Sequence, residues 1–159
     1  MKLREMTLAE LLALHVQIGE ELRARGISRS ANSLTSDFAE YLFCSAFGWE
    51  QEPNSKRGYD AKDSNGIRYQ IKGCWLHRRR KDRQLSALRN LKKRPFDMLA
   101  GILFADDYQV LRAALIPWAV VNEHARYNAH TNSAIFHLRD GVWLLDGVRD
   151  VTDTLKTLN

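Results

Sequence analysis

The sequence has few cysteines and no long apolar run, and each scarcity excludes a class of protein. Its two cysteines, Cys44 and Cys74, are too few for a disulfide scaffold and lack the spacing of metal ligands. We expect both to be reduced thiols. The first residues show no apolar run of signal-peptide length, and no stretch is long and apolar enough to cross a bilayer. We therefore expect a cytoplasmic protein that has no membrane partner.

Internal repeats, linkers and low-complexity segments are also lacking. The chain has 159 residues, of which 45% are hydrophobic and 27% are charged, as in an ordinary soluble domain with one core. We expect a single domain over residues 1–159.

The positive charge is concentrated in one segment. The net charge is +5, yet residues 77–94 contain nine bases and one acid, so the rest of the chain is slightly acidic. Such a segment is either a solvated face or a surface for phosphates, and its density of bases favours nucleic acid. The candidate binding residues are Arg78, Arg79, Arg80, Lys81, Arg83, Arg89, Lys92 and Lys93. The segment is a loop or a short helix, and the spacing of Leu85, Leu88 and Leu91 suits the helix.

Two helices are expected to precede the strands. Thr7 and Glu10 have the pattern of a capping box, and the helix that follows should end near Ala24, before Gly26. On its apolar stripe lies His15, which we expect to be a core or edge histidine rather than a ligand. The stripe consists of Leu8, Leu11, Leu12, His15, Ile18 and Leu22. A second helix is expected over residues 37–47, with Gly48 as its end.

Strand patterns follow, with two later helices. Residues 96–104 are almost continuously apolar, which is typical of a central buried strand, and residues 109–116 should pair with it as a hairpin. This element order predicts an α/β fold in which a central mixed sheet is flanked by helices. The remaining elements are a first strand at 49–53, a helix at 117–126, strand-like runs at 134–138 and 142–145, and a helix from about Val151.

A predicted β-hairpin lies between the second helix and the central strand. Its runs, 58–61 and 69–73, flank a turn-rich connection that ends in Asn65-Gly66. A two-residue loop would pair Asp60 with Ile71 and send the carboxylate to the wrong face. A three-residue loop over 64–66 pairs Asp60 with Gln70 and places at its third position Gly66, which tolerates positive φ. In that register Asp60, Gln70 and Lys72 converge.

An Asp, a short spacer and a strand with the pattern (Glu/Gln)-x-Lys resemble the PD-(D/E)XK nuclease superfamily, which has the restriction-endonuclease-like fold. Gln70-Ile71-Lys72 matches its Gln-x-Lys variant, and Glu40 stands where many members carry a Glu on the preceding helix. The segments 83–90 and 95–97 resemble an uncharacterised bacterial and phage branch of that superfamily. This resemblance implies a restriction-endonuclease-like core but no established activity.

The resemblance implies hydrolysis of phosphodiester bonds with Mg²⁺, with Mn²⁺ as a substitute. Asp60 would be the main metal ligand, the Gln70 amide oxygen and the Ile71 carbonyl would complete the set, and Glu40 would bind through water or hold a second ion. Lys72 would orient the attacking water or stabilise developing charge. Beside two carboxylates it should keep its proton, which favours the second role.

Two functions therefore remain open. One is a Mg²⁺-dependent DNA endonuclease, with RNA not excluded as substrate and a homodimer expected by analogy with enzymes that cut both strands. The other is a catalytically inactive module of the same fold that binds nucleic acid or regulates a partner. They differ in whether Glu40, Asp60, Gln70 and Lys72 converge around a metal-sized gap.

Overall fold

A six-stranded mixed sheet forms the centre of the molecule. The computed structural model describes residues 1–29, 33–53 and 58–158. The strands lie in the order β1-β2-β3-β5-β6-β9; β3 and β5 are parallel, and the other neighbours are antiparallel. Their bounds are β1 Glu50–Gln51, β2 Ala61–Lys62, β3 Arg68–Trp75, β5 Met98–Phe104, β6 Val110–Pro117 and β9 Arg149–Asp150.

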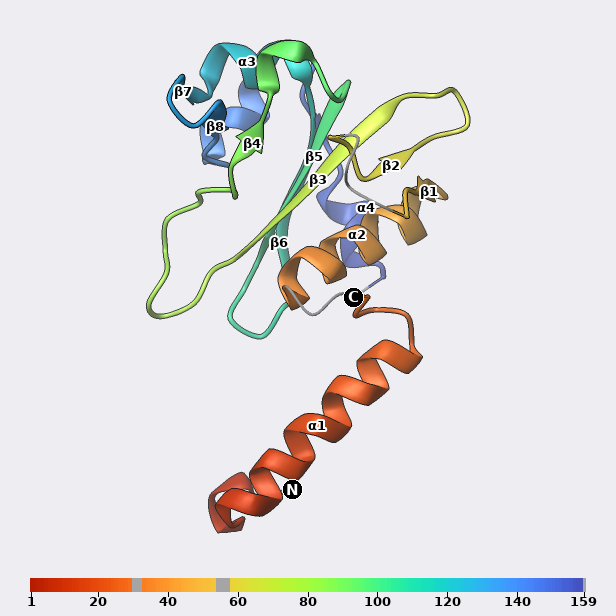
Figure 1. Cartoon of the computed structure of the whole chain (residues 1–159), viewed down its shortest axis with the longest axis vertical. Coiled ribbons are helices and arrows are strands. Elements are labelled where there is room, and N and C mark those ends of the chain that lie inside the picture. Colours follow the sequence, from red (N-terminus) through yellow and green to blue (C-terminus); the bar gives the residue numbers. More distant parts are fainter. Residues whose placement is uncertain (30–32, 54–57, 159) are drawn as a thin grey trace.

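Each face of the sheet is covered by its own layer (Figure 1). On one face pack α2 (Leu34–Phe47) and α4 (Thr152–Lys156), which bury Phe43, Ile71 and Ala100. On the other face lie α3 (Trp118–His124) and a three-stranded sheet in the order β4-β8-β7, with Cys74 and Leu99 buried beneath them. The bounds of that sheet are β4 Leu88–Arg89, β7 Arg126–Asn128 and β8 Ser133–Ile135. Short 3-10 helices occur at η1 Leu3–Glu5, η3 Leu91–Lys93 and η4 Asp140–Leu144.

The expected α/β class with a mixed central sheet is confirmed. The apolar run expected to be a central strand is β5, which lies between β3 and β6 and is antiparallel to β6 as predicted. Its side chains enter both buried clusters because successive residues of a strand point to opposite faces. No helix within the described ranges is long and apolar enough to cross a membrane.

Helix α1 (Leu8–Ala24) begins at the predicted capping box but does not join the core. Thr7 N donates to Glu10 Oε2 at 2.7 Å and Glu10 N donates to Thr7 Oγ1 at 3.3 Å, so each residue satisfies the other's backbone donor. None of the residues of α1 is buried, and the helix projects away from the sheet (Figure 1). The expected core or edge position of His15 is therefore wrong, since that side chain is exposed.

The helical alternative for the basic segment is also wrong. Leu85, Leu88 and Leu91 are buried, but the backbone between them bonds to another strand instead of to its own preceding turn. Leu85 N donates to the Phe136 carbonyl at 3.0 Å, and β4 pairs with β8. The run expected as a strand at 142–145 lies partly in the 3-10 helix η4.

Close packing at Gly73 fixes how α2 sits on β3. A Cβ atom at this position would lie 3.1 Å from Ala39 Cβ and 3.2 Å from the Thr35 carbonyl oxygen, and both of these atoms belong to α2. We expect Gly73→Ala to push α2 off the strand and lower the free energy of unfolding by about 1–3 kcal/mol. Urea denaturation measures the change.

Gly141→Ala is the matched control, because a Cβ there would meet no atom within 4 Å. It should leave the urea midpoint nearly unchanged. Equal midpoints for Gly73→Ala and the wild-type protein would contradict the close packing of α2 against β3.

Candidate functional site

The hairpin between β2 and β3 has the predicted three-residue loop. Ala61 pairs with Tyr69 and Lys62 with Arg68, the register in which Asp60 comes opposite Gln70. Gly66 adopts φ +80°, and its N–H donates to the Asp63 carbonyl at 3.1 Å. The Asp63 carboxylate closes the turn by accepting from Asn65 N and Ile67 N, at 2.9 and 3.0 Å. Local turn chemistry therefore sets the position of Asp60.

Asp60 lies beside the part of β3 that continues past its pairing with β2. Its residue is only 7% exposed, and its Oδ2 accepts from Gln70 Nε2 at 2.6 Å and from Ile71 N at 2.7 Å. Burial raises the pKa of the carboxyl, and the hydrogen bond from Ile71, the charge of Lys72 and the hydrogen bond from Gln70 oppose that rise without cancelling it. Asp60 is thus a buried acid that the strand backbone orients.

Glu40 approaches this acid from α2. Gln51 Nε2 on β1 donates to Glu40 Oε2 at 2.5 Å, and the Arg29 guanidinium lies 4.0 Å from the same oxygen. Burial, followed by the charge of Asp60, raises the pKa of Glu40 to about 7. The charge of Asp60 therefore reaches Glu40 and disfavours its ionisation.

Lys72 belongs to the same electrostatic group but lies on the opposite face of β3 from Ile71, by strand alternation. Its Nζ donates to Ser86 Oγ at 2.9 Å. Burial lowers the pKa of Lys72, against the opposing charges of Asp60 and Glu40, and Arg89 lowers it further. The two carboxylates alone would raise the pKa of Lys72. The expectation from sequence considered only their charges and omitted burial, which is the larger effect and lowers the pKa.

Gln70 turns its amide nitrogen, rather than its oxygen, toward Asp60. An ionised carboxylate only accepts hydrogen bonds, so this orientation suits the pair in the absence of a cation. For the Gln70 oxygen to join Asp60 as a ligand of one ion, the amide must rotate by half a turn.

The protein ligands for a metal ion are few. Within residues 1–29, 33–53 and 58–158, no three His, Cys, Asp or Glu side chains form a group that could hold one. Mg²⁺, however, is often bound through one or two carboxylates, with water and substrate phosphates completing its shell. Glu40 and Asp60 supply two neighbouring acids whose charge a cation would neutralise, and neither hydrogen bond to Asp60 ends on its Oδ1. The donor set fits Mg²⁺ or Mn²⁺, with the Gln70 amide and the Ile71 carbonyl as neutral candidates.

The predicted nucleic-acid-binding residues lie in the segment between the end of β3 and the end of η3. The chain after β3 runs back beside the sheet to β4 (Figure 1), and η3 follows, so the bases are spread along this segment, which we call the basic track. Arg83 forms an ion pair with Asp140 and Arg80 with Asp82. Among the described residues, no acid forms an ion pair with the other six, which are Arg78, Arg79, Lys81, Arg89, Lys92 and Lys93.

Sequence reasoning missed Ser86 and Gln51, which hold Lys72 and Glu40 in place. Ser86 is fourteen residues beyond Lys72 in a segment that folds back over β3, and Gln51 lies on β1, eleven residues from Glu40. Only the polarity of Ser86 among leucines and bases marks it in the sequence. Neither partner follows from a local spacing rule.

The pKa of Glu40 predicts a pH-dependent stability in metal-free buffer. The folded protein holds this proton more tightly than the unfolded chain, so the free energy of unfolding should fall as the pH rises from 4.5 to about 7. Glu40→Gln should remove this loss. It should be more stable than the wild-type protein at pH 8 by ~1–2 kcal/mol, which is part of the ~1.4 kcal/mol per pH unit that linkage allows for a partly solvated group.

Urea denaturation in EDTA at several pH values measures this difference. Near pH 4 the two proteins should be equally stable. Glu50→Gln, at an exposed acid on β1, is the control and should follow the wild-type curve throughout. A Glu40→Gln protein that is no more stable than wild type at pH 8 would argue against a raised pKa of Glu40 beside Asp60.

The chain was compared with protein-family models and with curated protein sequences. No family model matches it, and no curated sequence matches it either. The residues of this chain and their geometry therefore carry the functional argument.

Proposed function

We propose that this protein is a Mg²⁺-dependent phosphodiesterase that hydrolyses DNA through a restriction-endonuclease-like core. The observation that carries the proposal is the convergence of Asp60, Gln70 and the Ile71 N–H, with Glu40 and Lys72 electrostatically coupled to them. A buried acid with a second acid and a lysine, both half-buried, beside it is costly in a folded protein and is typical of sites that perform chemistry.

The order of the elements supports the proposed core. A helix that carries an acid, α2, precedes the hairpin, and β3 then pairs in parallel with the apolar strand β5. The resemblance of Gln70-Ile71-Lys72 to the nuclease superfamily implies this same arrangement. Pattern and geometry together therefore favour a nuclease over other α/β enzymes.

A bound Mg²⁺ would supply charge neutralisation at a non-bridging phosphate oxygen and would lower the pKa of a water that attacks phosphorus. Asp60, held by the Ile71 N–H, and Glu40 would bind it, and the Gln70 amide would add a neutral oxygen after rotating. Lys72, oriented by Ser86, presents an ammonium group to the charge that develops as the phosphodiester is cleaved. Because Gln replaces an acid, we propose weak metal affinity and a correspondingly larger role for Glu40.

The basic track would bind the phosphate backbone of the substrate. Arg89 lies near enough to Lys72 to lower the pKa of that lysine, so the track passes the proposed site. Each base that contacts a phosphate releases counterions, which adds affinity without reading the sequence. DNA is the proposed substrate, and the same contacts would serve RNA.

The second candidate is a module of the same fold that binds nucleic acid without cleaving it, or regulates a partner. It is favoured by the small number of acids, since Glu40 and Asp60 have no third carboxylate, histidine or cysteine grouped with them among the described residues. It retains the basic track and gives the acid pair a structural role only.

Cleavage of supercoiled plasmid with Mg²⁺ or Mn²⁺ separates these two functions. We expect nicking or linearisation by the wild-type protein and loss of at least 100-fold in rate, roughly, for Asp60→Ala and Lys72→Ala, since each removes a group that acts on the reacting phosphate. Circular dichroism should show that both variants fold. Equal rates in all three proteins would mean that the activity resides elsewhere. Salt-sensitive binding without cleavage would establish the binding module.

The basic track predicts a salt dependence of binding that can be assigned to residues. Arg78→Ala with Arg79→Ala removes two exposed bases, so the slope of log K against log salt should become less steep by about 2 if both contact phosphates. Fluorescence anisotropy with a labelled duplex measures the slope.

The control removes two exposed bases outside the track, Arg139 and Lys156, with the same change in net charge. It should leave the slope unchanged. An equal effect in both double variants would show that net charge alone, and not the track, governs binding.

A further inference from the structure

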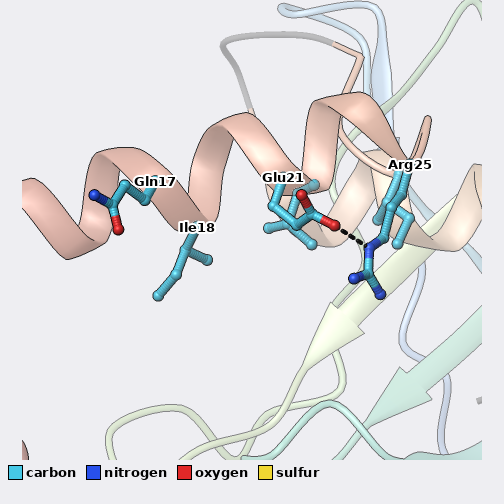
Figure 2. A pocket seen from close by; sticks show the side chains of 6 residues that line it. Gln17, Ile18, Glu21 and Arg25 are labelled. Carbon is cyan, nitrogen blue, oxygen red and sulfur yellow. Dashed lines mark hydrogen bonds and ion pairs between the residues drawn. The ribbon is translucent and has the colours of Figure 1, made fainter.

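Helix α1 carries an apolar stripe that its own chain leaves uncovered. Within this stripe Leu8, Leu12 and Ile18 are 73, 58 and 50% exposed, and Val16, which lies beside it, is 61% exposed. Ile18 points away from the helix, between Gln17 and the Glu21–Arg25 ion pair (Figure 2). A single helix of this length is marginally stable in water without tertiary packing. A surface from outside the described chain is therefore needed to cover it.

The spacing of the stripe is that of a seam between two helices. Leu8, Leu12, His15, Gly19 and Leu22 follow one another at intervals of four, three, four and three residues, the repeat that keeps one side of a helix against another helix. A Cβ atom at Gly19 would meet nothing within 4 Å. Glycine inside a helix costs stability relative to alanine, and nothing in the single chain requires it there, whereas a helix packed closely against the seam would.

Residues 1–27, which we call the arm, have a charge pattern that indicates the kind of partner. Residues 1–27 contain four bases and four acids, and none of the nine residues between Glu10 and Glu20 is charged. A helix that binds anionic lipid or nucleic acid is instead rich in Lys and Arg. The arm is uncharged in the middle and carries two bases and two acids at each end, so no net charge opposes its pairing with a second copy of itself.

The body of the protein favours the same orientation. The net charge of +5 lies entirely outside the arm, so a parallel pair would bring two basic bodies together, whereas an antiparallel pair holds them apart. The stripe also continues at its carboxyl end into a hollow lined by Leu22, Ile27, Leu34, Phe38 and Tyr41. In an antiparallel pair the amino end of the partner helix would lie near this hollow and extend the apolar contact.

We propose that α1 is a dimerisation arm, in which the stripes of two copies pack antiparallel about a two-fold axis near His15. The contact is isologous, because each copy offers the same stripe to the other. This inference does not rest on the proposed nuclease function.

The oligomeric state tests the arm. Light scattering after size exclusion should give twice the mass of one chain for the wild-type protein at tens of micromolar, and the mass of one chain for Leu12→Glu. Gln17→Glu introduces the same charge on the opposite side of the helix and should stay dimeric. A monomeric wild-type protein, or a dimer that survives Leu12→Glu, would overturn the proposal.

Disulfide trapping tests the orientation in a Cys44→Ser background. A tagged Leu8→Cys chain mixed with an untagged Leu22→Cys chain should form the mixed disulfide, because an antiparallel pair brings these positions together. A predominant disulfide between two Leu8→Cys chains would show a parallel pair and refute the arrangement. Cosedimentation of the wild-type protein with phosphatidylserine vesicles that is lost in Leu12→Glu would identify a membrane as the partner, and this outcome would also overturn the proposal.

Discussion

The candidate site depends on the two hydrogen bonds that Asp60 Oδ2 accepts, from Ile71 N and Gln70 Nε2. Strand β3 continues beyond its pairing with β2, and its backbone donors there need partners other than β2. The N–H of Ile71 donates to the Asp60 carboxylate, where a neighbouring strand would offer a carbonyl oxygen. The sheet backbone thereby sets both the direction and the burial of the acid, so the position of the site follows from where β2 ends.

The charge of Asp60 then acts on the groups around it. Together with the burial of Glu40 it raises the pKa of Glu40 to about 7, and both acids oppose the fall in the pKa of Lys72 that the burial of Lys72 causes. The three groups form a coupled set, in which a change in the charge of one alters the proton affinity of the others. A cation bound between the acids would lower their proton affinities and change the field at Lys72 as well. Binding of such a cation would therefore be linked to the protonation of this site.

The parts of the structure that were predictable from sequence are those that local chemistry determines. Gly66 at the positive-φ position selects the three-residue loop, and the loop sets the hairpin register. Thr7 and Glu10 cap α1 in the same local way. The contact between Lys72 and Ser86 was not predictable, because it depends on the path of a loop that is held by pairing with a distant strand.

Leu85, Leu88 and Leu91 show why periodicity alone misleads. Their three-residue spacing suits a helix. The segment instead forms backbone hydrogen bonds with Phe136 and β8, and in this irregular conformation it buries the same leucines. Arg89 between these leucines, and Lys92 and Lys93 after them, stay exposed, so one segment serves both the core and the basic track.

Helix α1 is the opposite case. The helix was predicted correctly, but none of its residues is buried against the described part of the chain. Periodicity reports which side of a helix is apolar but carries no information on what covers that side. In the body, α2, α4 and the small sheet already cover the two faces of the central sheet (Figure 1). The residues of α1 stay outside both buried clusters, so covering the stripe calls for a second surface of matching shape and charge. A neutral helix with an uncharged centre and mixed charges at its ends meets that requirement in its own copy.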